Sequence, residues 1–423
     1  MKTNFNAKAQ RREDAENVAT SIPRFSNHCT AELQFSFFFA SLRLCAFAFL
    51  IANSTQGSFG QTTNFSLRIA RANTNVTVAW TNRGTLQSAP TPSGAWGDVL
   101  EASNPSTRRP TNVHEFFRVI SRWGTRSNLL EANSEMGVAE LDGRIYVMGG
   151  YPASRVTQRT VQVYDVASNR WSYTTPLPIG VNHQMPAVAN GRLYVIGGQT
   201  DAGSAYTNTV FEFNPATTNW TTKAPMPTAR SAGAAVVIGN LIYVAGGRPP
   251  RGADFAVYNV LNNQWTTLPN LPTARNHLAA CAIDGKVYVA GGRIEGGFGS
   301  PMVNVLQMFD PATNQWRTLA PMPTTRGGIN GIAVDGCFFV WGGEGPIGPA
   351  NPDGMFNQME MYNAAMNRWY RLEPLPVAVH GVTGAAFVNG FIHAPGGGIH
   401  TGGSSGALIH QVFWVGGLCS PGP

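Results

Sequence analysis

The octapeptide GRLYVIGG, residues 191–198, returns five more times along the chain in closely related form. Each copy reads as a short β-strand of bulky apolar residues that ends in two glycines. The other copies are GRIYVMGG at 143–150, NLIYVAGG at 240–247, GKVYVAGG at 285–292, GCFFVWGG at 336–343 and GFIHAPGG at 390–397. A phrase used this often indicates a repeated architecture rather than a single functional site.

A tryptophan accompanies each copy at an almost constant distance. It precedes the first glycine of the following pair by 26 residues in five copies and by 27 in the last. The tryptophans are Trp123, Trp171, Trp220, Trp265, Trp316 and Trp369. The glycine pairs are Gly149 and Gly150, Gly197 and Gly198, Gly246 and Gly247, Gly291 and Gly292, Gly342 and Gly343, and Gly396 and Gly397. Such regular spacing predicts one structural role for each residue type in every repeat.

One repeat contains the parts of a four-stranded antiparallel sheet. Asp-Gly and Asn-Gly turns supply the positive φ angles of tight hairpins, and paired glycines let backbones approach closely. Such a sheet must bury its apolar faces against copies of itself. The glycine pair, the Tyr or Phe followed by Asp or Asn, the Trp and the Pro-x-Pro step resemble Kelch repeats from residue 123 to 415. The resemblance implies an all-β, six-bladed Kelch-type β-propeller over 122–416, with structural glycine pairs and tryptophans.

The two ends of the repeat region complement each other. The sixth copy ends with HQVFWV at 410–415, before any tryptophan strand, whereas Trp123 opens such a strand without a preceding glycine pair. We therefore predict that the strand near 122–129 completes the last blade and closes the propeller. Closure hides both exposed sheet edges.

Two segments precede the repeats. Residues 62–121 alternate apolar and polar positions, which predicts a small β-sandwich. Their TLQSA and FFRV stretches resemble fibronectin type III-like modules of secreted bacterial proteins, and a linker strand packed on the propeller is the alternative. Residues 1–54 combine a basic start with an apolar run at 44–52 too short to span a bilayer, as in an export signal. We expect a secreted, periplasmic or cell-surface protein, unless the true start lies further downstream.

The composition argues against several other classes. The formal net charge of +7 is spread thinly, and no dense Lys/Arg run interleaved with aromatic residues follows the first 60 residues, so we do not expect nucleic-acid binding. The five cysteines include no C-x-x-C pair, so neither a zinc knuckle nor a disulfide framework is indicated. Cys281 and Cys337 are expected to be buried, reduced thiols.

Enzymatic motifs are absent from the sequence. It contains no G-x-S-x-G, H-E-x-x-H or phosphate-binding loop, and we predict no metal and no cofactor. His393 replaces the tyrosine of its repeat and is expected to be buried against a neighbouring blade. Two enzyme groups share this propeller type. The copper site of galactose oxidases has no match here, whereas a sialic-acid mutarotase-like activity, which needs charged residues at the channel mouth, stays an alternative.

Charged residues recur in the two sets of loops that commonly surround one end of the central channel in Kelch propellers, here called the channel mouth. The set after the proline pair holds Arg230, Arg275, Arg326 and His380. The set after the glycine pair holds Arg248, Arg293 and Glu344. Guanidinium groups suit carboxylate or sulfate oxygens, although arginine at a repeat position can instead bond the blade backbone. We therefore expect a monomeric, non-enzymatic scaffold that binds an extracellular glycan or protein through an anionic group.

Overall fold

The computed structural model describes residues 65–419, except 111–113, 153, 202, 204, 298, 350 and 404. Within these ranges the regular elements are strands, and no helix is long and apolar enough to cross a membrane. The predicted export segment, residues 1–54, lies outside the described residues.

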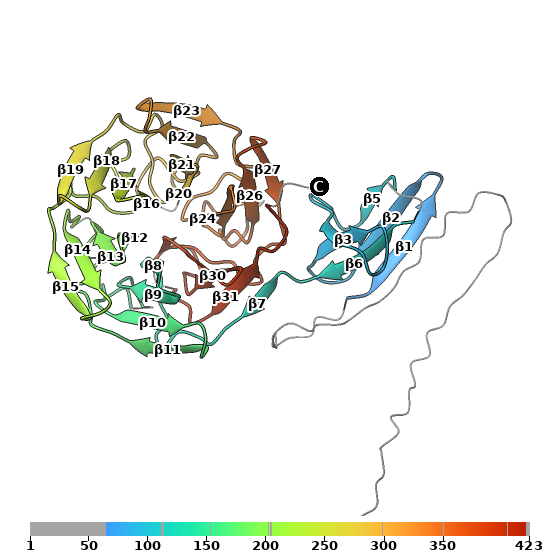
Figure 1. Ribbon diagram of the computed structural model, residues 1–423, viewed down its shortest axis with the longest axis horizontal. Coiled ribbons are helices and arrows are strands. Elements are labelled where there is room, and N and C mark those ends of the chain that lie inside the picture. Colours follow the sequence, from blue (N-terminus) through green and yellow to red (C-terminus); the bar gives the residue numbers. More distant parts are fainter. Residues whose placement is uncertain are drawn as a thin grey trace, which may run out of the picture. The chain divides into compact units, whose positions relative to one another are not determined.

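Six antiparallel sheets form a ring, as Figure 1 shows. Blade 1 comprises β8 (Met136–Leu141), β9 (Arg144–Met148), β10 (Val161–Asp165) and β11 (Arg170–Tyr173). Blade 2 comprises β12 (Met185–Ala189), β13 (Arg192–Ile196), β14 (Val210–Asn214) and β15 (Asn219–Thr222). Blade 3 comprises β16 (Ala234–Ile238), β17 (Leu241–Ala245), β18 (Phe255–Asn259) and β19 (Gln264–Thr267).

The remaining blades repeat this order. Blade 4 comprises β20 (Ala279–Ile283), β21 (Lys286–Ala290), β22 (Leu306–Asp310) and β23 (Gln315–Leu319). Blade 5 comprises β24 (Asn330–Val334), β25 (Cys337–Trp341), β26 (Met359–Asn363) and β27 (Arg368–Arg371). Blade 6 comprises β29 (Ala386–Val388), β30 (Phe391–Pro395), β31 (His410–Trp414) and β7 (Trp123–Thr125). The short strand β28 (Val382–Thr383) pairs in parallel with β8 of blade 1.

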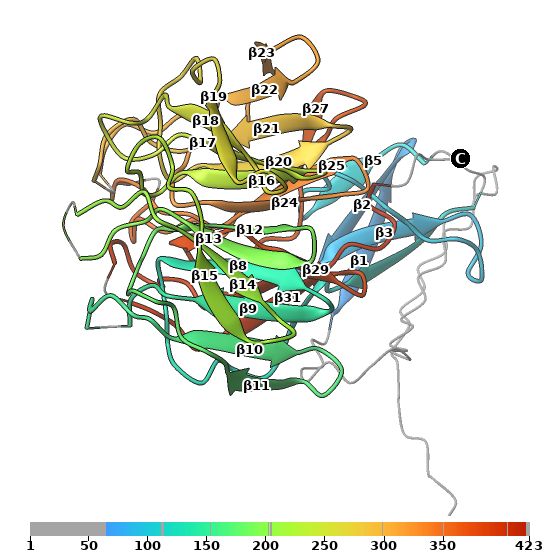
Figure 2. The same ribbon diagram turned by 60° about the vertical axis from the view of Figure 1, so that its left-hand side comes forward.

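The ring closes as the sequence predicts. Strand β7 pairs antiparallel with β31, so that Trp123 lies opposite Phe413, although the two residues are far apart in the chain. The innermost strands of successive blades contact one another around the centre, as Figure 2 shows for β8, β12, β16, β20 and β24. The prediction of a six-bladed propeller closed by its N-terminal strand is therefore confirmed.

The repeated residues have the structural roles expected of them. At Gly197, φ is 58°, and a Cβ atom would lie 2.6 Å from the carbonyl oxygen of Arg230 in the next blade, which only glycine avoids. The tryptophans stand in the outermost strands, and their indole nitrogens donate to carbonyls of the preceding blade. Trp171, for example, donates to Ser127 at 2.8 Å and Trp265 to Ala224 at 2.9 Å.

Buried side chains fill the spaces between blades. Cys281 and Cys337 are buried and unpaired, in agreement with the sequence prediction. His393 is also buried, and its ring packs 6.0 Å from that of Tyr164 in blade 1. Its Nδ1 atom lies 3.0 Å from Nε2 of His410, a second buried imidazole of the same blade. The sequence predictions are therefore confirmed. The two cysteines are buried in apolar strands, and His393 packs against a neighbouring blade.

The segment before the propeller forms two small sheets. One contains β1 (Leu67–Ala72), β2 (Asn75–Trp80) and β5 (Ser106–Arg108), and the other contains β3 (Thr85–Ala89), β4 (Gly97–Asp98) and β6 (Phe116–Ile120). Their shared core is Val76, Val78, Leu86 and Phe117. This arrangement agrees with a small β-sandwich, and its likeness to fibronectin type III modules stays a prediction.

Candidate functional site

The six blades each contribute one residue to a ring of backbone just before the innermost strands. These six residues, here called the inner ring, are Glu135, His183, Ala232, His277, Gly328 and Gly381. All have positive φ, between 52° and 66°. Five amides of the ring donate to the carbonyl of the preceding member, at 2.7–3.3 Å. The bonds therefore pass from blade to blade and hold every member in the left-handed conformation.

Three members of the inner ring carry ionisable side chains in this conformation. Glycine adopts it without cost, whereas other residues lose about 1–2 kcal/mol. Glu135, His183 and His277 nevertheless stand there, and all three are buried. Unfavourable backbone conformations of this kind cluster at functional sites. The inner ring is therefore the first place to look for a ligand or a reaction.

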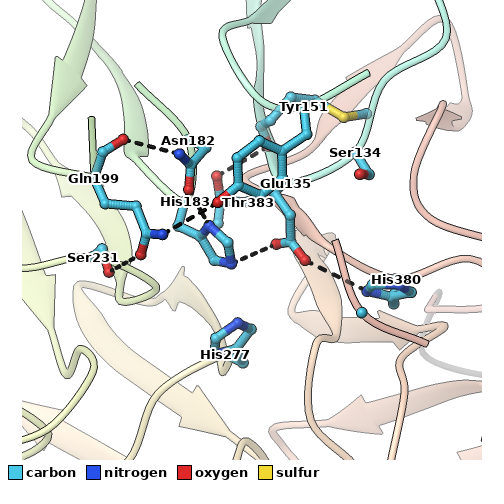
Figure 3. A network of polar contacts seen from close by, with 12 residues as sticks. Ser134, Glu135, Tyr151, Asn182, His183, Gln199, Ser231, His277, His380 and Thr383 are labelled. Carbon is cyan, nitrogen blue, oxygen red and sulfur yellow. Dashed lines mark hydrogen bonds and ion pairs between the residues drawn. The ribbon is translucent and has the colours of Figure 1, made fainter. Parts of the chain in front are cut away.

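Glu135 and His183 form the centre of the site, as Figure 3 shows. Oε2 of Glu135 lies 2.9 Å from Nε2 of His183. Burial opposes ionisation of Glu135, but the charge and hydrogen bond of His183, with further charge from His380 and Arg248, hold the carboxyl pKa well below its usual value. Burial also lowers the pKa of the His183 imidazole, against the opposing effect of Glu135. Glu135 is thus held as a carboxylate in contact with the imidazole of His183.

Asparagine side chains orient both histidines of the ring. Nδ1 of His183 bonds Oδ1 of Asn182, and Nδ1 of His277 bonds Oδ1 of Asn276. The Nδ2 atoms of both asparagines donate to backbone carbonyls, which fixes the direction of each amide. Because an amide oxygen only accepts, Nδ1 carries a proton in both imidazoles, and both Nε2 atoms face the centre of the site.

Arg248 reaches this centre from the loop that follows the glycine pair of blade 3. Its Nη2 atom lies 3.1 Å from Nε2 of His183 and 3.5 Å from Nε2 of His277. Its Nη1 atom donates to the carbonyl of Gly296 at 2.6 Å. Among the described residues it forms no ion pair with a carboxylate, and it is partly exposed. Arg248 is thus a cation with imidazole neighbours and access to solvent.

A second group of charges lies beside the first. Arg293 and Glu344 form an ion pair, with Nη2 and Oε1 2.7 Å apart and both side chains 2% exposed. Nδ1 of His380 lies 3.6 Å from Oε1 of Glu344 and 3.7 Å from Oε1 of Glu135. His380 therefore connects the two carboxylates, and the site as a whole balances two arginines with two carboxylates.

The structure separates the seven residues predicted from the sequence into two sets. It brings Arg248, Arg293, Glu344 and His380 together around the inner ring. It does not bring Arg230, Arg275 or Arg326 there. These three are at most 1% exposed and donate to carbonyls of their own blades. The bonds run from Arg230 to Val244, from Arg275 to Val289 and from Arg326 to Val340, at 3.3, 3.0 and 3.3 Å.

The two sets of residues differ because the chain directs the side chain differently at each repeat position. Arg326 lies against its own blade, where it also forms an ion pair with Glu360, and both side chains are 0% exposed. The expectation that three guanidinium groups point toward one region therefore differs from the structure. Their alternative role, bonding of the blade backbone, is the one that their contacts describe.

Glu135, His183 and His277 are the site residues that sequence reasoning missed. They stand two residues after the arginine position, where the other repeats have Ala232, Gly328 or Gly381. An ionisable residue at a position otherwise restricted to small residues was the available signal. The Asn-His pair at 182–183 and again at 276–277 was a second one.

The centre of the channel offers little room below the inner ring. A cavity of about 20 Å³ lies between the innermost strands, lined by small and apolar residues that include Ala234, Ala279 and Ile329. That volume holds about one water molecule. No larger molecule fits in this cavity.

Comparison with known proteins agrees with this architecture. Residues 182–397 match the family model of the KLHDC2/KLHL20/DRC7 Kelch-repeats domain, and residues 132–178 match the Kelch motif. The chain is 32% identical to Kelch-like protein terF of Aspergillus terreus over 317 residues, 69% of this chain and 68% of that protein. It is 46% identical to mouse Kelch-like protein 36 over 67 residues, only 11% of that protein.

A solved structure shares the fold. The structure of YjhT superimposes with a TM-score of 0.56 over 68% of this chain and 96% of that chain, at 16% sequence identity. At that identity the likeness concerns the fold alone. The repeat spacing, the closed ring of six four-stranded blades and the family match together show that this chain belongs to the Kelch-repeat family.

Proposed function

We propose that the propeller recognises a compact ligand bearing a carboxylate or another small anionic group at its channel mouth, and that Arg248 receives the anion. Arg248 carries this proposal because it is a partly exposed guanidinium without a carboxylate partner among the described residues. Its Nε atom is buried and has no hydrogen-bond partner. A ligand carboxylate at the exposed part of the guanidinium would give Arg248 a direct ionic partner.

A comparison with the neighbouring Arg293 explains why Arg248 is the arginine proposed to bind the ligand. Arg293 is already neutralised by Glu344, whose other oxygen accepts a bond from the amide of Gly402 at 2.7 Å. Breaking a buried ion pair costs several kcal/mol, so Arg293 is poorly suited to exchange its partner for a ligand. Arg248 loses only contacts with two imidazoles and one carbonyl.

The proposal is tested with acidic sugars in a buffer that contains EDTA. N-acetylneuraminic acid and galacturonic acid serve as anionic probes, galactose as the neutral control, and a glycan array extends the search. Arg248→Met should weaken binding of the acidic probes at least tenfold, about 1.4 kcal/mol. Arg317→Met, which removes an exposed arginine of β23, should leave it unchanged. Equal affinities of Arg248→Met and the parent protein would refute the role of Arg248.

A sialic-acid mutarotase-like activity is the second candidate, because Glu135 and His183 form a carboxylate–imidazole pair beside Arg248. Such a pair can transfer protons during anomer exchange. However, the strongly lowered pKa of Glu135 makes it a weak base, since proton transfer is most efficient when the pKa is near the working pH. Recognition is therefore preferred. Anomer exchange followed by NMR, with Glu135→Gln as the comparison, separates the two functions.

We further propose that the protein is exported and acts as a monomer outside the cytoplasm. The apolar run at 44–52 and the ANS sequence at 52–54 support export. Cell fractionation with N-terminal sequencing of the mature protein should find a first residue near 55. Light scattering should give the mass of one chain. An unprocessed cytoplasmic product would contradict the export proposal.

A further inference from the structure

We propose that Glu135, His183 and His277 form a binding site for one divalent transition-metal ion, with Zn²⁺ as the best-fitting candidate. One ligand atom from each of the three side chains can be chosen so that all lie within 4.8 Å of one another, and the three residues are buried. Two imidazoles and one carboxylate are a common ligand set of zinc sites that keep one position open. This inference goes beyond the anion-recognition proposal, and the two proposals share Arg248.

The imidazoles are oriented as metal ligands require. A metal-bound histidine donates its other ring N–H to an oxygen acceptor, which fixes both the tautomer and the ring plane. Here Asn182 and Asn276 accept from Nδ1 of His183 and His277, so both Nε2 atoms face the centre of the site. The same Asn-His arrangement occurs in blades 2 and 4.

The spacing of these atoms also suits a metal ion. Nε2 of His183 lies 2.9 Å from Oε2 of Glu135, within hydrogen-bond distance, and a metal ion would take the place of the proton between them. The guanidinium of Arg248 lies 3.1 Å from the same Nε2 atom. In a tetrahedral site with bonds near 2.0–2.1 Å, ligand atoms lie about 3.4 Å apart, so Glu135 and His183 need to separate by only about 0.5 Å.

The backbone holds the three ligands ready for such an ion. Glu135, His183 and His277 are members of the inner ring, where hydrogen bonds between blades fix their left-handed conformation. Arg248 instead belongs to a loop and is partly exposed. We infer that the ion takes the place of the Arg248 guanidinium between the imidazoles. Arg248 therefore competes with the metal ion, whereas it assists the binding of an anionic ligand.

Because Arg248 opposes metal binding but assists anion binding, its substitution should change the two affinities in opposite directions. The full chain without an affinity tag is stripped with EDTA, dialysed and titrated with ZnCl₂ by calorimetry, and Co²⁺ is used in parallel for its visible absorption bands. The parent protein should bind one ion per chain. Glu135→Gln and His277→Gln should each lower the affinity at least a hundredfold. Arg248→Met should raise it at least tenfold, although the same change weakens binding of acidic sugars.

The controls identify where the ion binds and whether the variants are folded. His400→Gln changes an exposed histidine and should leave the affinity unchanged. Circular dichroism and melting temperature should show that Glu135→Gln and His277→Gln remain folded. Three results would overturn the inference: no stoichiometric binding to the parent protein, binding that survives both ligand substitutions, or an affinity that Arg248→Met does not raise.

Discussion

Arg275 and His277 lie two residues apart in the same turn of blade 4, yet their side chains meet different surroundings. Arg275 donates to the carbonyl of Val289 at 3.0 Å and to Oε1 of Gln307 at 2.6 Å, both in its own blade. His277 instead approaches Arg248, which belongs to blade 3, and its ring packs 5.1 Å from that of His183 in blade 2. The first residue stabilises one sheet, and the second joins groups from three blades.

The comparison shows that the repeat position, and not the residue type, decides the role of a charged side chain. At the arginine position the side chain lies against the glycine strand of the same blade and finds carbonyl acceptors there. At the inner ring the left-handed backbone brings the side chain beside its equivalents from other blades. Charge at the first position therefore bonds within one blade, whereas charge at the second contacts polar groups of other blades.

The largest loss of stability is expected from a substitution at the arginine position, where the side chain bonds within its own blade. Arg326→Met leaves the carboxylate of Glu360 buried without its cation, which should lower the free energy of unfolding by about 3–5 kcal/mol. Urea denaturation measures it. The exposed Arg317→Met is the matched control and should change stability by less than about 0.5 kcal/mol. A loss below about 1 kcal/mol in Arg326→Met would contradict the structural role.

A smaller loss of stability is expected when a methyl group is added at an inner-ring position that has glycine. In Gly381→Ala the new Cβ would lie 2.7 Å from the carboxyl of Glu135, at a φ of 65°. Unfolding free energy should fall by about 2–3 kcal/mol, since a clash adds to the left-handed cost. Gly390→Ala is the control, because Gly390 has a φ of 82° and open space around it. This variant should lose only the cost of the left-handed backbone, about 1–2 kcal/mol. Equal losses in the two variants would show that the ring tolerates a side chain there.

The smallest effect concerns a buried histidine outside the ring. Burial lowers the pKa of His393 from 6.5 to about 3, so the unfolded chain takes up this proton first as the pH falls. The stabilising contribution is therefore complete above about pH 6.5 and is lost progressively toward pH 3. His393→Phe, which copies Phe339 of blade 5, should lose about 1.4 kcal/mol less stability between pH 7.5 and 5.5 than the parent protein.

Urea midpoints measured at the two pH values provide this comparison. The absolute stability of His393→Phe is expected to fall, because His410 loses its hydrogen bond with residue 393. Only the change between the two pH values reports the histidine proton. An identical change in the parent protein and the variant would mean that His393 is protonated in the folded state as readily as in the unfolded chain.

The fold was predictable because every repeat repeats the same physical requirements. The glycine pair, the tryptophan and the tight turns each demand one local geometry, and six copies leave few arrangements other than a closed ring. Four members of the site were also predictable. Arg248, Arg293, Glu344 and His380 stand in loops that the family resemblance places at one end of the channel, and the structure brings them together.

The sequence by itself determined the blades, their number and the strand that closes them, since these depend on spacing and on local backbone preferences. It did not determine which side chains meet. Glu135 and His277 are more than a hundred residues apart, and they share one site only because closure brings blades 1, 2 and 4 around a common centre. The direction of each side chain depends on a left-handed turn held by bonds between blades. Those bonds exist only in the complete ring, so the tertiary structure alone separates the structural arginines from the residues of the site.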